Sequence, residues 1–169
     1  MLVFREPSQT KSVSILIRGG SKTIIDEAHR SIHDALCVIR NLIKNPHVIV
    51  GGGASELSSS IYLRKIADQT SSVEQYAIRA FASALEQIPL ILADNSGMNA
   101  NEALQRAKTR QIQENNPQIG ISCLTAEVDN MANVGVFETL VSKKHQVQLA
   151  AQVVKMILKI DDLVEQVSF

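Results

Sequence analysis

The feature that most constrains the fold of this sequence is an amphipathic pattern of about five helical turns that begins at Ser21. Its apolar residues recur at intervals of three and four, as they do along one face of a helix. They are Ile24, Ile25, Ala28, Ile32, Ala35, Leu36, Ile39, Leu42 and Ile43. Ser21 is a favourable N-cap, and Asn45-Pro46 ends the pattern because proline disfavours helical backbone in the preceding residue. A long amphipathic helix is therefore predicted.

The remaining sequence favours further helices and a few short strands. Helices are predicted from Ala54 to about Gln69, from Ser72 to Pro89, from Asn99 to about Glu114, and from Val147 to about Asp161. Ser72 and Gln75 have the spacing of a capping box. Extended segments are predicted at 12–17, 48–50, 118–124 and 134–141, with a polar loop at 125–133. The predicted fold class is mainly α with a few short strands (α+β).

Composition excludes several classes of partner. The 17 basic and 17 acidic side chains cancel, which leaves no basic surface for nucleic acid and no polybasic segment for a membrane. Aromatic residues make up only 4% of the chain, too few for the stacking that single-stranded nucleic acid requires. We expect neither a signal peptide nor a membrane-spanning segment, since no apolar run approaches roughly 20 residues. Cys37 and Cys123 form no C-x-x-C pair, so a soluble, cytoplasmic protein is expected.

Gly51-Gly52-Gly53 stands between an apolar strand and a helix. Without a Cβ, such backbone can approach a ligand closely near the positive end of a helix dipole. The same residues also suit a tight turn where a strand and a helix pack closely. Neither G-x-x-x-x-G-K-[ST] nor G-x-G-x-x-G occurs, so the standard phosphate and dinucleotide motifs do not decide between these readings.

Three polar features have both a structural and a functional reading. Asp34 points away from the apolar face of its helix, either as a solvated carboxylate paired with Arg30 or as a general base facing a cleft. His29 and His33 have helical i, i+4 spacing, but no further ligands complete a metal site, and none is expected. Glu138 follows an apolar run and is by default an exposed carboxylate.

Several stretches resemble the group II chaperonins, the ring-forming, ATP-dependent folding machines of archaea and the eukaryotic cytosol. They are IRGG at 17–20, SIHDALCVIRNLIK at 31–44, GGGA at 51–54, EQYAIRAFASALEQIP from Glu74, ADNSGMN from Ala93 and KMILKIDD from Lys155. The resemblance covers nearly the whole chain. Because family subunits are much longer, it implies a C-terminal third: residues 1–19 as the end of the apical segment, 20–46 as the intermediate-domain helix, and 47–169 as the C-terminal half of the equatorial, ATP-binding domain.

The resemblance also implies roles for single residues. Asp34, in the HDAL stretch, matches the catalytic aspartate that orients the water attacking the γ-phosphate. Gly52, together with Gly51 and Gly53, matches the backbone that lies against the nucleotide. Glu138 matches an acidic residue that accepts hydrogen bonds from the ribose hydroxyls.

Two further residues complete the implied nucleotide-binding set. Lys143 lies near Glu138 in the sequence. Ser122 stands where the family commonly has an acidic residue at the adenine end of the site, so the side-chain contact differs there. The family's Gly-Asp-Gly-Thr-Thr phosphate loop and its magnesium-binding aspartate do not occur in this sequence.

The implied function is that of a subunit of an ATP-dependent ring chaperonin that folds cytosolic proteins of the actin and tubulin type. Its implied cofactor is ATP with Mg²⁺, and its partners are the other subunits of a double ring and unfolded clients, with no nucleic acid or membrane. Without the phosphate loop, the chain alone is expected neither to hold these cofactors nor to hydrolyse ATP. The alternative is a helical interaction or assembly fragment without nucleotide chemistry. Apolar helix faces left without partners also predict self-association.

Overall fold

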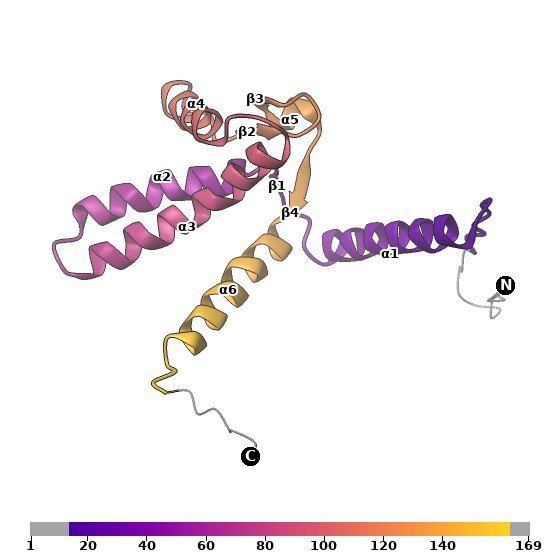
Figure 1. The fold of residues 1–169 in the computed structure, drawn as a ribbon, viewed down its shortest axis with the longest axis horizontal. Coiled ribbons are helices and arrows are strands. Elements are labelled where there is room, and N and C mark those ends of the chain that lie inside the picture. The colour runs from indigo at the N-terminus through magenta and orange to yellow at the C-terminus, as the bar shows by residue number, and fades with distance from the viewer. Residues whose placement is uncertain (1–13, 163–169) are drawn as a thin grey trace, which may run out of the picture. The chain divides into compact units, whose positions relative to one another are not determined.

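The computed structural model describes residues 14–162, which form six helices and four short strands. In chain order these are α1 (Lys22–Lys44), β1 (Val48–Val50), α2 (Ala54–Gln69), α3 (Glu74–Asn95), α4 (Ala100–Gln113), β2 (Ile119–Ser122), β3 (Glu127–Asn130), α5 (Met131–Val134), β4 (Phe137–Thr139) and α6 (Leu140–Ile157), as Figure 1 shows. The chain divides into two compact units, of which the first ends at Asn45 and the second begins at Pro46. The predicted class, mainly helical with a few short strands, is confirmed.

The first unit contains the long helix that the sequence predicted. The Ser21 hydroxyl accepts a hydrogen bond from the Ile24 amide at 3.3 Å, so Ser21 is the N-cap. The helix ends at Lys44, and none of its residues is buried. The strand predicted at 12–17 is wrong for residues 14–17, which form neither a helix nor a strand. Residues 12 and 13 lie outside the described part.

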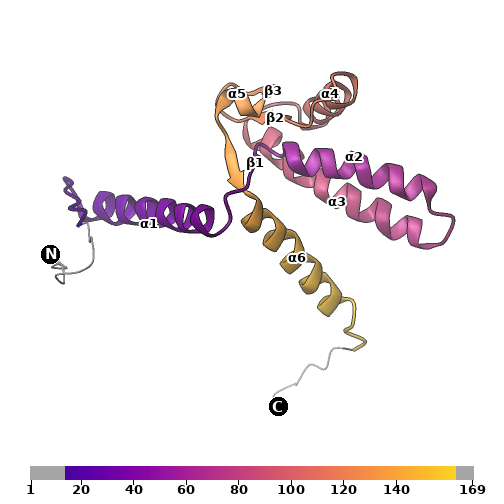
Figure 2. The same ribbon diagram turned by 180° about the vertical axis from the view of Figure 1, so that it is seen from behind.

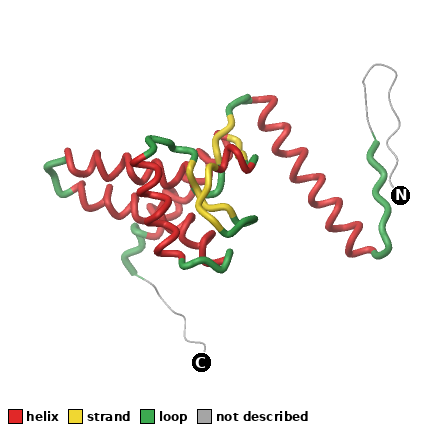
Figure 3. The backbone as a smooth tube through the Cα atoms, turned by 90° about the horizontal axis from the view of Figure 1, so that it is seen from above, coloured by secondary structure: helices red, strands yellow, loops and turns green. Residues whose placement is uncertain are grey.

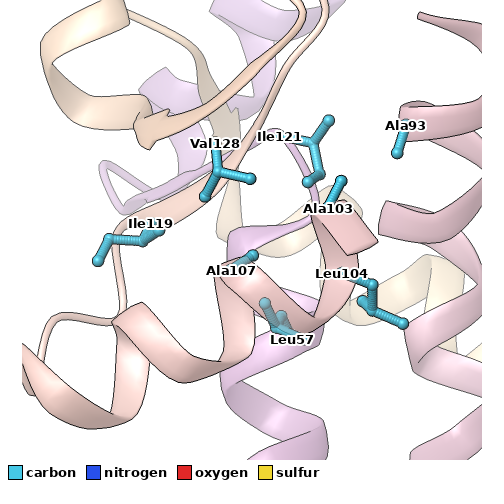
Figure 4. Packing of buried hydrophobic residues seen from close by; sticks show 8 residues of the cluster. All are labelled: Leu57, Ala93, Ala103, Leu104, Ala107, Ile119, Ile121 and Val128. Atoms are coloured by element: carbon cyan, nitrogen blue, oxygen red, sulfur yellow. The ribbon is translucent and has the colours of Figure 1, made fainter. Parts of the chain in front are cut away.

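The second unit is built on a hairpin of two helices, α2 and α3, which lie side by side in both views of the ribbon (Figures 1 and 2). α4 packs against α3, and the side chain of its N-cap, Asn99, accepts a hydrogen bond from the Glu102 amide. Buried apolar side chains from these helices and from the β2–β3 hairpin meet in one cluster (Figure 4). Its members are Leu57, Ala93, Ala103, Leu104, Ala107, Ile119, Ile121 and Val128.

Two small antiparallel sheets join segments of this unit (Figure 3). β1 pairs with β4 so that Ile49 lies opposite Glu138, although the two residues are far apart in the sequence. β2 pairs with β3, with Ser122 opposite Glu127. The β1–β4 pairing therefore places the acidic residue of β4 next to the strand that leads into the glycine run.

Three predicted segments differ from the structure. The polar loop at 125–133 contains β3 and α5, because Ala126 turns the chain at φ +52°. α6 begins at Leu140 and ends at Ile157, so it replaces part of the extended segment predicted at 134–141.

Within the described range, no helix is long and apolar enough to cross a membrane.

α3 is the third difference, because it continues through Pro89 to Asn95 instead of ending there. Proline removes only one backbone donor, and here its ring is fully buried against the glycine run. The predicted capping box is also wrong, since α3 begins at Glu74 and the Ser72 hydroxyl donates to the Glu74 carboxylate at 3.4 Å.

Glu86 of α3 connects three helices of the second unit, α2, α3 and α4. Its buried carboxylate accepts from Ser60 and Arg64 of α2 and from Lys108 of α4, the last at 2.7 Å. Burial by itself raises the pKa of Glu86, but these hydrogen bonds and the charge of Lys108 bring the pKa below its ordinary value.

Acid should weaken the second unit partly through Glu86. A lowered pKa in the folded state gives stability that is present above the unfolded pKa of about 4.3 and is lost as the pH falls through the lower folded value. Glu86→Gln should cost about 2 kcal/mol at pH 7 and flatten this acid loss in urea titrations. Glu102 supplies the control, because it forms an exposed ion pair with Arg106. Glu102→Gln should therefore lower the free energy of unfolding by less than about 0.5 kcal/mol. Equal losses of stability in Glu86→Gln and Glu102→Gln would contradict a special contribution of Glu86 to the acid sensitivity.

Candidate functional site

The glycine run forms the turn between β1 and α2, and neighbouring segments surround it closely. Gly52 has a φ of +65°, and its carbonyl accepts from the Ile121 amide at 2.8 Å. A Cβ at Gly52 would lie 2.8 Å from the Ile121 carbonyl oxygen, and one at Gly53 would lie 2.8 Å from the Cβ of Pro89. The tight-turn reading of the sequence is therefore confirmed for the second and third glycines, whose missing side chains make room for protein atoms.

Gly51 differs from the other two glycines because one of its two neighbouring side chains carries a charge. Its amide donates to the Val136 carbonyl at 3.0 Å. A Cβ on Gly51 would lie 2.9 Å from the Cγ1 atom of Val136 and 3.1 Å from the Oε1 atom of Glu138. The carboxylate of Glu138 thus lies directly over the first glycine, a contact that the pairing of β1 with β4 creates.

Lys143, near the start of α6, joins Glu138 to a second carboxylate. Its Nζ lies 2.6 Å from Glu138 Oε2 and 2.6 Å from Glu56 Oε1. Glu56 is in the first turn of α2, directly after the glycine run. The structure therefore brings together Gly51, Glu138 and Lys143 of the sequence-derived set and adds Glu56.

The electrostatics of this cluster favour charged side chains despite burial. Burial raises the pKa of Glu56, but hydrogen bonds from Lys143 and Ser55, its own backbone amide and the charge of Lys143 hold the pKa below its usual range. Burial lowers the pKa of Lys143, and the hydrogen bonds to Glu138 and Glu56 together with their charges bring the pKa above its usual value. Both groups are ionised at neutral pH.

Sequence reasoning missed Glu56, although one signal was present. A carboxylate in the first turn of a helix interacts favourably with the helix dipole, and Glu56 occupies that place in the helix that follows the glycines. The pattern does not identify its partner, because Lys143 comes 87 positions later in the chain.

Ser122 lies at the end of β2, next to the residue that bonds Gly52. Its side chain is fully buried, and its hydroxyl oxygen accepts from the Thr125 hydroxyl at 2.9 Å and from the Thr125 amide at 3.4 Å. The Ser122 side chain is thus engaged in the β2–β3 turn.

Asp34 is exposed on α1, in the first unit, whereas the other candidate residues belong to the second. The pairing with Arg30 considered from the sequence is wrong, because Arg30 forms its ion pair with Glu27. His33 has its Nε2 3.7 Å from the sulfur of Cys37, one turn further along α1. Among residues 14–162, no group of three His, Cys, Asp or Glu side chains is placed to hold a metal ion.

Known proteins place this chain in a family. The family model described as TCP-1/cpn60 chaperonin family matches residues 1–168. T-complex protein 1 subunit epsilon of Encephalitozoon cuniculi is 42% identical over 164 residues, covering 97% of this chain and 31% of that protein. A thermosome subunit of Methanothermococcus thermolithotrophicus is 37% identical over 97% of this chain and 30% of its own length. Thermosome subunit beta of Sulfurisphaera tokodaii is 39% identical over 96% of this chain and 30% of its own length.

The chain thus spans about a third of the length of the curated relatives that it matches. Within the family, SGMN at 96–99, GISCL at 120–124 and ETL at 138–140 resemble the epsilon type of eukaryotic subunit, the type that the relative from Encephalitozoon cuniculi is named for. The match of the family model over nearly the whole sequence shows that the chain belongs to the TCP-1/cpn60 chaperonin family.

Proposed function

We propose that this chain is the C-terminal part of a subunit of an ATP-dependent ring chaperonin, in which it forms one wall of the nucleotide site. In this assignment residues 1–19 end the apical segment, 20–46 form the intermediate-domain helix, and 47–169 form the C-terminal half of the equatorial domain. The partners are the other subunits of a double ring and unfolded cytosolic proteins of the actin and tubulin type. The working compartment is the cytoplasm.

The observation that carries the proposal is the arrangement around Gly51. A half-exposed carboxylate, that of Glu138, lies over backbone that has no side chain, and Lys143 holds it from the other side. Glycine backbone allows a ligand to come close, and a carboxylate accepts hydrogen bonds from hydroxyl groups. We assign Gly51, Gly52 and Gly53 to the nucleotide-facing turn, Glu138 to the ribose hydroxyls, and Ser122 to the adenine end through its backbone.

Asp34 is assigned to the chemical step. Phosphoryl transfer depends mainly on positioning and charge stabilisation, and one carboxylate can orient the attacking water. Its exposure on α1 leaves its oxygens available for that role. In the complete subunit, ATP with Mg²⁺ is the proposed substrate complex. The resemblance to the group II chaperonins implies a magnesium-binding aspartate in the N-terminal half of the subunit, and we assign the magnesium ligand to that half.

The alternative function, a helical interaction or assembly fragment without nucleotide chemistry, also has a supporting observation. α6 has no buried residue, and its apolar side chains include exposed Leu149, Val153 and Ile157. Such surface is typical of a protein that associates with another chain or with itself. The two functions differ in whether a complete nucleotide site forms once the rest of a subunit is present.

A chimeric subunit tests the proposal. This chain replaces the matching segment of the thermosome subunit of Methanothermococcus thermolithotrophicus, and ATP turnover is measured beside that unaltered subunit. We expect ATP turnover in the chimera and, for Asp34→Asn, a fall in kcat of about a hundredfold with little change in KM. The matched control is Asp26→Asn, another exposed aspartate on α1, which should retain turnover. A folded chimera that binds no ATP would support the interaction fragment instead.

A further inference from the structure

Lys143 is shared by two carboxylates that come from different elements and differ sharply in burial. Glu56 is contributed by α2 and Glu138 by β4, and each has an oxygen 2.6 Å from the Lys143 ammonium. The exposed fractions of the side chains are 2% for Glu56, 15% for Lys143 and 35% for Glu138. An ammonium group has three hydrogens, so it can donate to both carboxylates at once.

Glu56 is the fixed end of this arrangement. One of its oxygens accepts from Lys143, and the other accepts from the Ser55 hydroxyl at 2.8 Å. A buried carboxylate that loses its cation is strongly unfavourable, so Glu56 keeps the Lys143 ammonium inside the protein. Without that attraction the flexible lysine side chain could extend into solvent.

Glu138 is the end that depends on the other two. β-Sheet pairing fixes its backbone opposite Ile49, but rotation about its side-chain bonds remains free unless a contact selects one rotamer. Lys143 supplies that contact through Oε2, which leaves Oε1 over Gly51. Because one ammonium is shared by two carboxylates, the cluster keeps a net negative charge, and Glu138 remains a strong acceptor.

We propose that Glu56 is a positioning residue that acts through Lys143 to hold the Glu138 carboxylate over Gly51, in the orientation that accepts a hydrogen bond from the ribose of a nucleotide. This inference rests on the proposed function, because it requires Glu138 to contact the ribose. It goes further by assigning ribose recognition in part to a residue that is itself buried away from the nucleotide.

The chimeric subunit provides the test, with kcat/KM measured for ATP and for 2′-deoxyATP. The ratio of the two values reports a single hydroxyl contact and compares the same folded molecules, so a change in stability alone does not move it. With the unaltered chain we expect ATP to be preferred about tenfold, as for one hydrogen bond to a charged acceptor. Glu138→Ala should bring the ratio close to one.

Glu56→Gln is the decisive variant, because glutamine keeps the size of the side chain but removes the charge that retains Lys143. We expect the preference for ATP to fall to about threefold or less. Glu86→Gln is the matched control, since Glu86 is also a buried glutamate paired with a lysine, and it should leave the preference unchanged. If Glu56→Gln does not fold, Glu56→Gln with Lys143→Met removes both buried charges and should also lose the preference.

The outcomes separate the inference from the proposed function. No ribose preference in the unaltered chimera, or one that survives Glu138→Ala, would overturn both. A preference that depends on Glu138 but persists in Glu56→Gln, or in the double variant where that must be used, would overturn the positioning role alone. If Glu86→Gln reduced the preference for ATP as much as Glu56→Gln does, the positioning role of Glu56 would also be overturned. The reduction would then result from replacing any buried glutamate.

Discussion

Replacing Gly53 with alanine is expected to destabilise the second unit by about 4 kcal/mol. Two costs combine, the left-handed backbone at φ +71° and a methyl group placed 2.8 Å from the Cβ of Pro89. A non-glycine residue in this conformation costs on the order of 1–3 kcal/mol, and overpacking of a filled site costs a similar amount. Pro89 cannot move aside easily, because it is a rigid, buried ring within α3.

Gly97 provides the control that separates these two costs. It has nearly the same backbone, at φ +78°, but no atom lies within 4 Å of the place where its Cβ would be. Gly97→Ala should therefore cost only about 1 kcal/mol. Urea denaturation followed by the methyl signals of Leu57 and Ile121 measures the second unit selectively, because both side chains belong to its core. Similar losses for the two variants would show that packing against Pro89 contributes nothing.

The contrast between these glycines shows what the sequence could predict of the turn. Three consecutive glycines between a strand and a helix indicate that something approaches the backbone closely. They do not indicate what approaches, because the contacting residues, Pro89 and Ile121, come from segments far along the chain. The same limit explains the error at α3, where proline predicts a helix end and tertiary packing against Gly53 permits the helix to continue.

The helices were predicted best where local patterns suffice. α1 and α4 begin directly after Ser21 and Asn99, whose side chains accept from the backbone amide three residues later. β3 was missed because three of its four residues, Glu127, Asp129 and Asn130, are polar, and the strand depends on pairing with the buried β2. α6 extends further toward its N-terminus than its apolar spacing indicates, and it begins directly where β4 ends.

The candidate site was likewise predicted from the sequence only in part. Its residue types were identified by resemblance, and the structure brings Gly51, Glu138 and Lys143 together through the β1–β4 pairing. The buried Glu56 was not identified, because a single carboxylate in a first helical turn is common and its partner is remote in the sequence. Asp34 belongs to the first unit, so its place in the catalytic step stays a prediction for the chimeric subunit.

Lys143→Met should destabilise the second unit by about 3–5 kcal/mol at pH 7, because it leaves the Glu56 carboxylate buried without a cation. Methionine fills nearly the same space, so the loss reports charge rather than packing. Lys144→Met is the control on the adjacent, exposed lysine and should change the free energy of unfolding by under about 0.5 kcal/mol. The measurement is urea denaturation of each variant at a series of pH values.

The pH dependence identifies Glu56 as the cause. In the unaltered chain the lowered pKa of Glu56 contributes stability that is present above the unfolded value of about 4.3 and is lost as the pH falls through the folded value. Without Lys143, the hydrogen bond and the charge that lower the pKa of Glu56 are lost while burial stays, so we expect the pKa of Glu56 to rise. Protonation of Glu56 then removes the unpaired buried charge in the variant. The difference in the free energy of unfolding between the two proteins should therefore shrink as the solution is acidified.

Removing both charges completes the argument. Glu56→Gln with Lys143→Met removes both ions of this buried pair, so it should recover most of the stability that Lys143→Met loses. Glu138 cannot replace Glu56 in this balance, because its side chain is far more exposed and is not the carboxylate left buried when Lys143 is removed. Two results together would contradict a stabilising buried ion pair: a double variant as unstable as Lys143→Met, and a stability difference from the unaltered chain that does not change with pH. The role of Lys143 would then lie in packing alone.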